Sequence, residues 1–506
     1  MTHLLGIPLH LLPLVLLGLS LLAGVIIFLL PERAKVARTT VNLTAAIAKV
    51  VLLALLLPVV LEEDLPAWRS PLLPGVELVL RIDTLSLVFA SLSAVLWLVT
   101  TVYAIGYLEG RPNRSRFFGF FSLCVTATVG ISFAGNLVTF LLFYEMLTLV
   151  TYPLVAHYGT VAALKAARLY LIYALTGGLV LLVGIVWLTA MVGPVEFRAG
   201  GVPAVAALAE ADPVAATWIF VLLIGGLGVK AALVPLHGWL PRAMVAPAPV
   251  SALLHAVAVV KAGAFGIARV LEDVYGPRVA EDLGVLLPLL VLACGTVVYG
   301  SVRALAQDDL KARLAYSTVS QVSYVTLGLA LATSAGITGG IVHLVHQGLM
   351  KITLFFCAGL FAEALGVTKV SQLAGMARRM PVSATAFTVA GLGMMGIPPV
   401  AGFVSKWYLG LGALEADQPW VVAVLLSSAL LNALYFLPVI YVMWFREPGE
   451  PVLAGQGHHG RGEAPLTLLV PAVTTASLAL AAGLLAAAPF SPLAAAQVIA
   501  ERVVTR

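Results

Sequence analysis

The chain has 506 residues, of which 61 % are hydrophobic and only 10 % are charged, whereas soluble domains usually carry about 25 % charged residues. This composition excludes an arrangement of soluble domains and predicts a single polytopic membrane domain over residues 1–506. The formal net charge is +5, but the basic residues are scattered among short loops, which argues against a nucleic-acid-binding surface.

Apolar stretches of about 20 residues, the length that crosses about 30 Å of hydrocarbon, recur along the whole chain. They predict an all-α integral membrane protein with about fourteen transmembrane helices. The first seven predicted segments are Leu4–Leu30, Thr40–Leu61, Thr84–Tyr107, Phe117–Phe133, Leu137–Tyr158, Leu169–Val192 and Ala215–Val234. The second seven are Val250–Val270, Leu283–Val302, Leu314–Thr333, Gly336–Leu365, Val382–Leu411, Val421–Trp444 and Leu466–Ala488.

The loops between these segments differ in basic residues. Seventeen lysines and arginines fall in loops after odd-numbered segments, against seven in loops after even-numbered segments and in the C-terminal tail. Cytoplasmic loops carry the excess of basic residues, so we expect the odd loops in the cytoplasm, both termini outside it, and the protein in the inner (plasma) membrane of the cell.

The other five basic residues lie within the predicted segments, and they are Lys49, Lys230, Lys261, Lys351 and Lys406. A lysine at the bilayer centre costs about 2.5–3.5 kcal/mol, so such residues usually face a bundle interior and mark an ion or proton path. Glu145 is the only carboxylate near the middle of a predicted segment and supplies a counter-ion. The alternative is that lysines snorkel to the headgroups or form static helix contacts, and for Lys49 the two interpretations weigh equally.

Two segments are predicted to break. Lys230 precedes Pro235, His237 and Pro241 in the seventh segment, and Lys406 follows Pro398 and Pro399 in the twelfth. Proline frees backbone carbonyls, which membranes tolerate only inside protein or beside a wet cavity. Corresponding breaks indicate two inverted five-helix repeats. We predict N-terminal helices over residues 1–110, the repeats over 115–272 and 282–446, and the fourteenth helix with its tail over 464–506.

Four histidines, His237, His255, His343 and His346, fall in or beside these segments. Neutral imidazole passes protons near physiological pH. His343, Gln347 and Lys351 recur at every fourth residue, which places them on one stripe of the eleventh helix. A proton relay through lysines and histidines is therefore predicted. The alternative role for a lone histidine is packing. For His346 the relay role and the packing role weigh equally.

Other motifs are set aside. Gly391–Gly396 matches a dinucleotide-binding pattern, but no strand precedes it and it lies inside an apolar segment, so helix packing explains its glycines better. His458 and His459 lie in a polar loop and are interpreted as solvated. The three cysteines are isolated in apolar runs without paired spacing. We expect no metal, cofactor or redox centre on this chain, and thus no enzyme activity beyond a translocase role.

Several motifs together resemble the antiporter-like proton-translocating subunits shared by respiratory complex I, membrane-bound hydrogenases and Mrp-type cation/proton antiporters. The resemblance covers about residues 80–445 and rests on five pieces. These are Tyr144-Glu145-Met, Lys230 to Pro241, Leu254-His255-Ala with Val260-Lys261-Ala-Gly, Asp309 to Gln321, and Gly396-Ile-Pro-Pro with Lys406. The segments that begin at Ala315 and Lys351 look most similar to the D-type subunit of Mrp antiporters and its relatives.

The resemblance implies roles for individual residues. Glu145 and Lys230 would form the input pair, Lys261 and the polar row of the eleventh helix the lateral relay, and Lys406 the terminal site. This chain departs from many relatives at Gln347, where they have a second histidine, because glutamine holds water but carries no proton charge. We also expect that the chain is not the largest complex I membrane subunit, since too few residues follow the fourteenth segment for that subunit's long lateral helix.

The leading functional hypothesis is a proton-translocating subunit of a multisubunit monovalent cation (Na⁺)/proton antiporter. Its expected partners are other membrane subunits, the lipid bilayer, protons, and Na⁺ or another monovalent cation. The alternative within the same class is a proton-pumping membrane-arm subunit of a complex I-like NADH-quinone oxidoreductase or a membrane-bound hydrogenase. A non-transporting scaffold is the third hypothesis, and it has no use for buried charges that are costly to insert.

Overall fold

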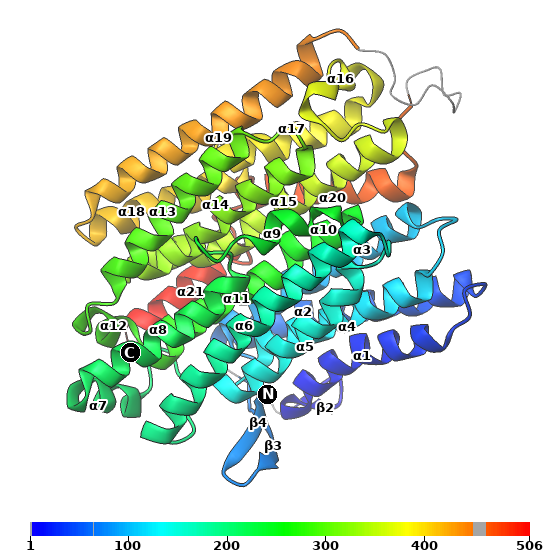
Figure 1. Ribbon diagram of the computed structural model, residues 1–506. Helices are drawn as coiled ribbons and strands as arrows, with labels where there is room; N and C mark the ends of the chain where they lie inside the picture. The colour runs from blue at the N-terminus through cyan, green and yellow to red at the C-terminus, as the bar shows by residue number, and fades with distance from the viewer. Residues whose placement is uncertain (1–2, 64, 449–461, 506) are drawn as a thin grey trace.

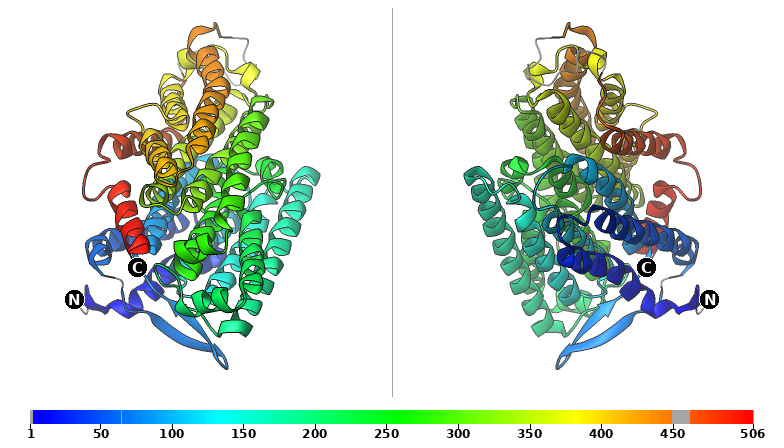
Figure 2. Two further views of the ribbon diagram at one scale, coloured as in Figure 1. Left: turned by 90° about the vertical axis from the view of Figure 1, so that its left-hand side faces the viewer. Right: turned by 90° about the vertical axis from the view of Figure 1, so that its right-hand side faces the viewer.

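The computed structural model describes residues 3–63, 65–448 and 462–505, so His458 and His459 lie outside the described residues. Long helices run side by side through a single bundle, and the strand pair β3–β4 projects from one end (Figure 1). The views at right angles show the same arrangement, with the N-terminal helices along one flank of the bundle (Figure 2).

The elements of the N-terminal half are mostly long apolar helices. They are β1 (His3–Leu4), β2 (Ile7–Pro8), η1 (Leu9–Leu11), α1 (Leu12–Leu29), α2 (Lys35–Glu62), β3 (Trp68–Leu73), β4 (Val76–Leu80), α3 (Thr84–Tyr107), α4 (Arg114–Phe133), α5 (Leu137–Val155), α6 (Val161–Val192), α7 (Pro203–Ala211), α8 (Pro213–Lys230), α9 (Trp239–Arg242), η2 (Ala243–Val245), α10 (Ala248–Ala252), η3 (Leu253–Val257), α11 (Val259–Ala268) and η4 (Arg269–Tyr275).

The C-terminal half continues in the same way. Its elements are α12 (Pro277–Asp282), α13 (Leu286–Leu305), α14 (Leu310–Ala330), α15 (Ser334–Leu365), η5 (Val370–Gln372), α16 (Met376–Arg379), α17 (Pro381–Met395), α18 (Ala401–Glu415), α19 (Pro419–Phe445), α20 (Leu466–Leu484) and α21 (Pro492–Val504).

The predicted all-α membrane fold is confirmed. Within the described residues, twelve helices are long and apolar enough to cross a membrane. The two other predicted segments coincide with α14, whose polar residues lower its hydropathy, and with the α17–α18 pair of short helices. The total number of crossings and the two-repeat organisation stay predictions.

The chain is broken at both proline-rich positions. Helix α8 ends at Lys230 and a turn leads to the four-residue helix α9. Helix α17 ends at Met395, and Gly396 caps it with φ +90°, a backbone conformation that glycine adopts without steric penalty. Helix α18 then starts at Ala401. In both breaks the proline ring prevents a continuous helix.

A third interruption was not predicted. The eighth segment, expected as one helix over Val250–Val270, extends over Ala248–Tyr275 and changes between α and π geometry. Its irregular point is Ala258, with φ −116° and ψ −81°, directly after the π-helical turn that carries His255. Every residue in the apolar window of this segment is buried, so its irregular backbone is enclosed by protein.

The β3–β4 hairpin and α21 lie outside the predicted segments. Strands β3 and β4 form an antiparallel hairpin in the stretch expected as a loop. The C-terminal tail forms α21, which packs against α15 and α3 and buries Leu493, Ile499 and Val503. Helix α21 has 13 residues, too few for a membrane span.

Helix α15 lies at the centre of the packing. It contacts α14, α17, α18, α20 and α21, and also α10 and η3 from the other half of the chain. The Thr333 hydroxyl accepts a hydrogen bond from the Gly336 N–H at 3.1 Å and caps its start. Polar side chains on α15 therefore face several helices within the protein.

Candidate functional site

Lys230 and Glu145 face one another from α8 and α5. The Lys230 ammonium donates a hydrogen bond to the Tyr144 carbonyl and lies 3.3 Å from the centre of the Tyr144 ring. It is close enough to Glu145 for their charges to interact, although no ion pair of 4.0 Å or less joins them. Both Glu145 carboxylate oxygens are buried and make no hydrogen bond within the described residues. The two groups form an electrostatic pair without direct contact.

Lys261 links α11 to α15. It is completely buried, and its ammonium donates a hydrogen bond of 2.7 Å to the Leu344 carbonyl. His343 neighbours this carbonyl in the chain, and its imidazole lies within electrostatic reach of both Lys261 and Lys406. His343 Nδ1 lies 2.8 Å from the Ser405 hydroxyl on α18. His343 therefore lies between two lysines from opposite halves of the chain.

Lys406 reaches back across the break in the twelfth segment. Its ammonium donates hydrogen bonds of 2.8 and 3.1 Å to the Met394 and Met395 carbonyls at the end of α17. The carbonyl end of a helix attracts cations, because the backbone dipoles leave partial negative charge there. Lys406 is partly exposed in the isolated chain. The break thus supplies acceptors to the lysine.

Lys351 on α15 lies near Lys261, and His255 in η3 lies near Lys351. The Lys351 ammonium donates hydrogen bonds to the Ser317 hydroxyl and, at 3.3 Å, to the Leu314 carbonyl. It is within electrostatic reach of Lys261, and His255 is within reach of Lys351 and Lys311. The His255 ring stacks on Phe355 at 4.5 Å between ring centres. Both side chains are completely buried.

Several buried polar atoms around these residues lack a hydrogen-bond partner within the described residues. They are Nε2 of His343, both ring nitrogens of His255 and His346, both side-chain amide atoms of Gln321 and Gln347, and the hydroxyl of Tyr324. Buried polar groups are nearly always paired with protein or with ordered water. Ordered water is the usual partner of such buried atoms where the protein supplies none.

Some predicted site residues lie apart from this cluster. His237 is half-buried in the turn after α8, where its ring contacts Tyr299 and Tyr316, and Arg303 is the charged group that acts on it. Pro235, Pro398 and Pro399 are exposed and lie in the two breaks. Trp239 donates a 2.8 Å hydrogen bond to the Val229 carbonyl in the first break.

The snorkelling interpretation of Lys49 is wrong. Its side chain is completely buried and donates a 2.6 Å hydrogen bond to the Ser20 hydroxyl, which also accepts one from Thr126. Its ammonium lies 5.2 Å from the centre of the Trp97 ring. Lys49 belongs to a contact among α1–α4, and no other buried lysine acts on it.

Sequence reasoning did not single out the residues that hold the lysines in place. The Tyr144 carbonyl accepts a hydrogen bond from Lys230, and the Ser317 hydroxyl accepts one from Lys351. The Ser405 hydroxyl is the partner of His343. Gly178 on α6 leaves room for Glu145, because a Cβ there would overlap the Glu145 carboxylate. All but Gly178 lie in or next to the motifs that predicted the site, but their partners are far away in sequence.

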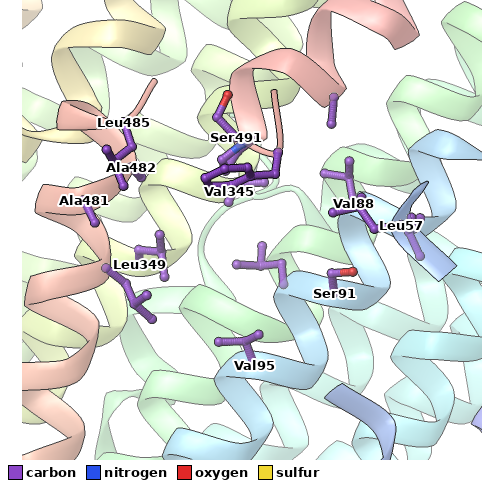
Figure 3. Close-up of a pocket in the computed structure, with 16 residues that line it drawn as sticks. Leu57, Val88, Ser91, Val95, Val345, Leu349, Ala481, Ala482, Leu485 and Ser491 are labelled. Atoms are coloured by element: carbon purple, nitrogen blue, oxygen red, sulfur yellow. The ribbon is translucent and has the colours of Figure 1, made fainter. Parts of the chain in front are cut away.

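An apolar pocket of about 390 Å³ lies between α2, α3, α15, α20 and α21. Val345 and Leu349 of α15 line it together with Val88 and Val95 of α3 (Figure 3). None of the lysines or histidines above is among its lining residues. The pocket is therefore separate from the polar cluster.

Comparison with known proteins identifies relatives of this chain. Residues 134–431 match the family described as NADH:quinone oxidoreductase/Mrp antiporter, and residues 75–118 match the N-terminal family of complex I chain 5. The NADH-quinone oxidoreductase subunit N of Desulforudis audaxviator is 38 % identical over 418 residues, 80 % of each chain. A probable K⁺/H⁺ antiporter A/B subunit of Rhizobium meliloti is 30 % identical over 74 % of this chain and 37 % of its own length.

Solved structures show the same fold. A chain of the Mrp complex from Dietzia sp. DQ12-45-1b superposes with a TM-score of 0.84 at 24 % identity, and the match covers 98 % of this chain and 97 % of that one. The family match covers more than half of the chain and includes Glu145, Lys230, Lys261, Lys351 and Lys406. The chain is therefore a member of the NADH:quinone oxidoreductase/Mrp antiporter family of proton-translocating membrane subunits.

Proposed function

We propose that this chain is the proton-translocating subunit of a multisubunit monovalent cation/proton antiporter, with Na⁺ as the coupled cation. The observation that carries the proposal is the set of lysines on α8, α11, α15 and α18, three of them buried and Lys406 partly exposed, with His343 within electrostatic reach of both Lys261 and Lys406. Buried ionisable groups are costly in a membrane and usually mark an ion or proton path.

The proposed route starts at Glu145 and Lys230. A proton that reaches the carboxylate weakens its attraction for the Lys230 ammonium, which frees that lysine to pass its own proton on. The next groups are Lys261, His343 and Lys406. Lys351 and His255 join this line at Lys261, and water bound to the unpaired polar atoms of Gln321, His346 and Gln347 would connect the side chains. Gln347 acts here by holding water rather than by carrying charge.

A second candidate function is a proton-pumping subunit in the membrane arm of a complex I-like oxidoreductase or membrane-bound hydrogenase. The similarity to a subunit N over 80 % of both chains favours it. Co-purification separates the two functions. Partners that carry flavin or iron–sulfur clusters would identify the oxidoreductase, whereas other membrane subunits and a Na⁺-driven pH change in vesicles would identify the antiporter.

Gly178 gives a test that leaves every ionisable group in place. Gly178→Ala puts a methyl group where the Glu145 carboxylate lies, so the carboxylate must move away. A displacement of about 1 Å in a reacting group costs up to about 100-fold in rate, and we expect a loss of that order in cation-driven pH change in vesicles. Gly225→Ala on α8 is the matched control, because a Cβ there meets nothing within 4 Å. Equal rates for the two variants would show that the position of Glu145 is not critical.

We also propose that both termini lie outside the cytoplasm of a plasma membrane, as the distribution of basic residues predicts. Alkaline phosphatase fused after Arg506 should then be active, and a fluorescent protein fused at the same position should stay dark. A bright fluorescent fusion together with an inactive phosphatase fusion would place the C-terminus in the cytoplasm. That result would contradict an even number of crossings with both termini outside.

A further inference from the structure

A second group of buried charges lies at the end of the bundle that carries the β3–β4 hairpin, outside the route proposed above. It consists of Asp83 at the start of α3 and Arg269, Glu272 and Asp273 in η4, and we call it the Arg269 cluster. All four residues are at least nine-tenths buried. The π-helical turns of η4 carry Arg269, Glu272 and Asp273 into the protein interior.

Arg269 holds the cluster together. Its Nη1 lies 2.9 Å from Asp83 Oδ2 and 2.5 Å from Asp273 Oδ2, and its Nη2 donates a 3.0 Å hydrogen bond to Asp83 Oδ1. Ser86 Oγ accepts a further hydrogen bond from Nη2 at 2.8 Å. Both terminal nitrogens of the guanidinium are therefore occupied by two aspartates and a hydroxyl, in the forked geometry that arginine favours.

Glu272 has no such partner. Its side chain is 1 % exposed, and neither carboxylate oxygen makes a hydrogen bond within the described residues. The charged groups that act on it are Asp273, Arg269 and Asp83. Helices α7, α8 and α12 also pack against η4, but none of their charged residues acts on Glu272.

The charge balance shows what Glu272 can bind. Arg269 and Arg81, whose Nη2 lies 3.8 Å from Asp83 Oδ2, balance the two aspartates. An ionised Glu272 adds one uncompensated negative charge to a buried site, which is strongly unfavourable, whereas a protonated Glu272 adds none. A bound metal cation does not fit, because the guanidinium lies between the two aspartates and no three potential ligands form a metal group within the described residues.

We propose that Glu272 is a proton-binding site that exchanges protons between Lys261 and the hairpin end of the bundle. Glu272 follows Lys261 by 11 residues on the same segment, about three helical turns or about 16 Å along its axis. In the exchange the carboxylate accepts a proton to become a neutral carboxylic acid and later returns it to water at the hairpin end. The transport step rests on the proposed function, whereas proton binding by Glu272 does not.

The test is infrared difference spectroscopy of the purified, assembled complex between high and low pH, together with proton transport in vesicles. Glu272→Gln keeps the shape of the side chain but cannot bind a proton at this position. Glu281→Gln, at an exposed position on α12, is the matched control. We expect the wild type and Glu281→Gln to share a carbonyl-stretch band of a protonated carboxyl that Glu272→Gln lacks, and transport to fall at least about tenfold in Glu272→Gln alone.

Each other outcome has a definite meaning. A band that persists in Glu272→Gln overturns proton binding at this residue, and a lost band with unchanged transport overturns its place on the route. If the wild-type complex has the band but moves no protons, the proposed function fails and the proton-binding site stands. If Glu272→Gln does not assemble, Glu272→Asp keeps a carboxyl and should show a shifted band, and an unshifted band would contradict the assignment.

Discussion

Lys406→Arg is expected to reduce cation-driven proton movement about as completely as Lys406→Ala, by about 100-fold or more. A positioned group that accepts and donates a proton contributes on the order of 10²–10⁴-fold to a rate. Arginine keeps the positive charge and can still donate hydrogen bonds to the Met394 and Met395 carbonyls that Lys406 binds. It cannot be deprotonated in proteins, so a proton cannot leave through it.

The comparison of these variants separates two roles of Lys406. If its ammonium only neutralises the carbonyl end of α17, arginine should be nearly as good as lysine. Lys369→Arg, at an exposed loop position, is the control for the lysine-to-arginine exchange itself and should behave as wild type. The measurement is the pH change in vesicles that carry the assembled complex at matched expression. Full activity of Lys406→Arg would show a fixed charge, and the route would have to end at another residue.

Glu145→Gln and Lys230→Ala should each lower transport to the level of vesicles without the complex, while the protein stays inserted and assembled. The Glu145 oxygens and the Lys230 ammonium are buried and act on each other across α5 and α8 without touching. When either Glu145 or Lys230 is replaced, the remaining charged group is buried without its counter-charge. It also has no partner with which to exchange a proton. Glutamine has the shape of glutamate but accepts no proton.

Leu149→Ala provides the control for a local change on α5, because Leu149 lies one turn after Glu145 and its side chain is exposed. It should leave transport within about threefold of wild type. Assembly is checked by co-purification of the other subunits for every variant. Wild-type ion flux in either Glu145→Gln or Lys230→Ala would show that the pair is not the input site.

The sequence was sufficient to predict the features that depend on local composition. Each predicted segment coincides with a helix, a helix pair or, for the eighth, a run of α and π turns, because about 20 apolar residues in a row are unusual outside membranes. Pro235 and Pro398 marked both breaks, since proline has no N–H to continue a helix. The lysines within the predicted segments were also visible in the sequence, because a charged residue is rare in an apolar stretch.

Features that depend on distant partners could not be predicted. Lys49 has no polar neighbour on its own helix, and its partner Ser20 belongs to α1. The π-helical turn at Leu253–Val257 contains no glycine or proline that would indicate an interruption. The burial of Arg269 depends on Asp83, 186 residues earlier in the chain. Long-range contacts of this kind leave no periodic pattern in the sequence.

The position of Glu145 illustrates the same limit within the site. Its motif identified the carboxylate, but the space that it occupies is provided by Gly178 on a different helix. Likewise, His343 and Lys351 lie on one helix, yet their partners Ser405 and Ser317 come from α18 and α14. The residue types of the proposed relay were visible in the sequence, whereas the partner of each side chain required the folded structure.

We propose that protons cross the membrane by a route through the buried side chains of this chain. Its most direct test is proton flux into proteoliposomes that contain the purified, assembled complex and an internal pH dye, with an imposed Na⁺ gradient. We expect the wild-type complex to acidify or alkalinise the lumen according to the direction of the gradient, and complexes with Glu145→Gln or Lys406→Arg to match protein-free liposomes. Wild-type proton flux in both variants would contradict the claim.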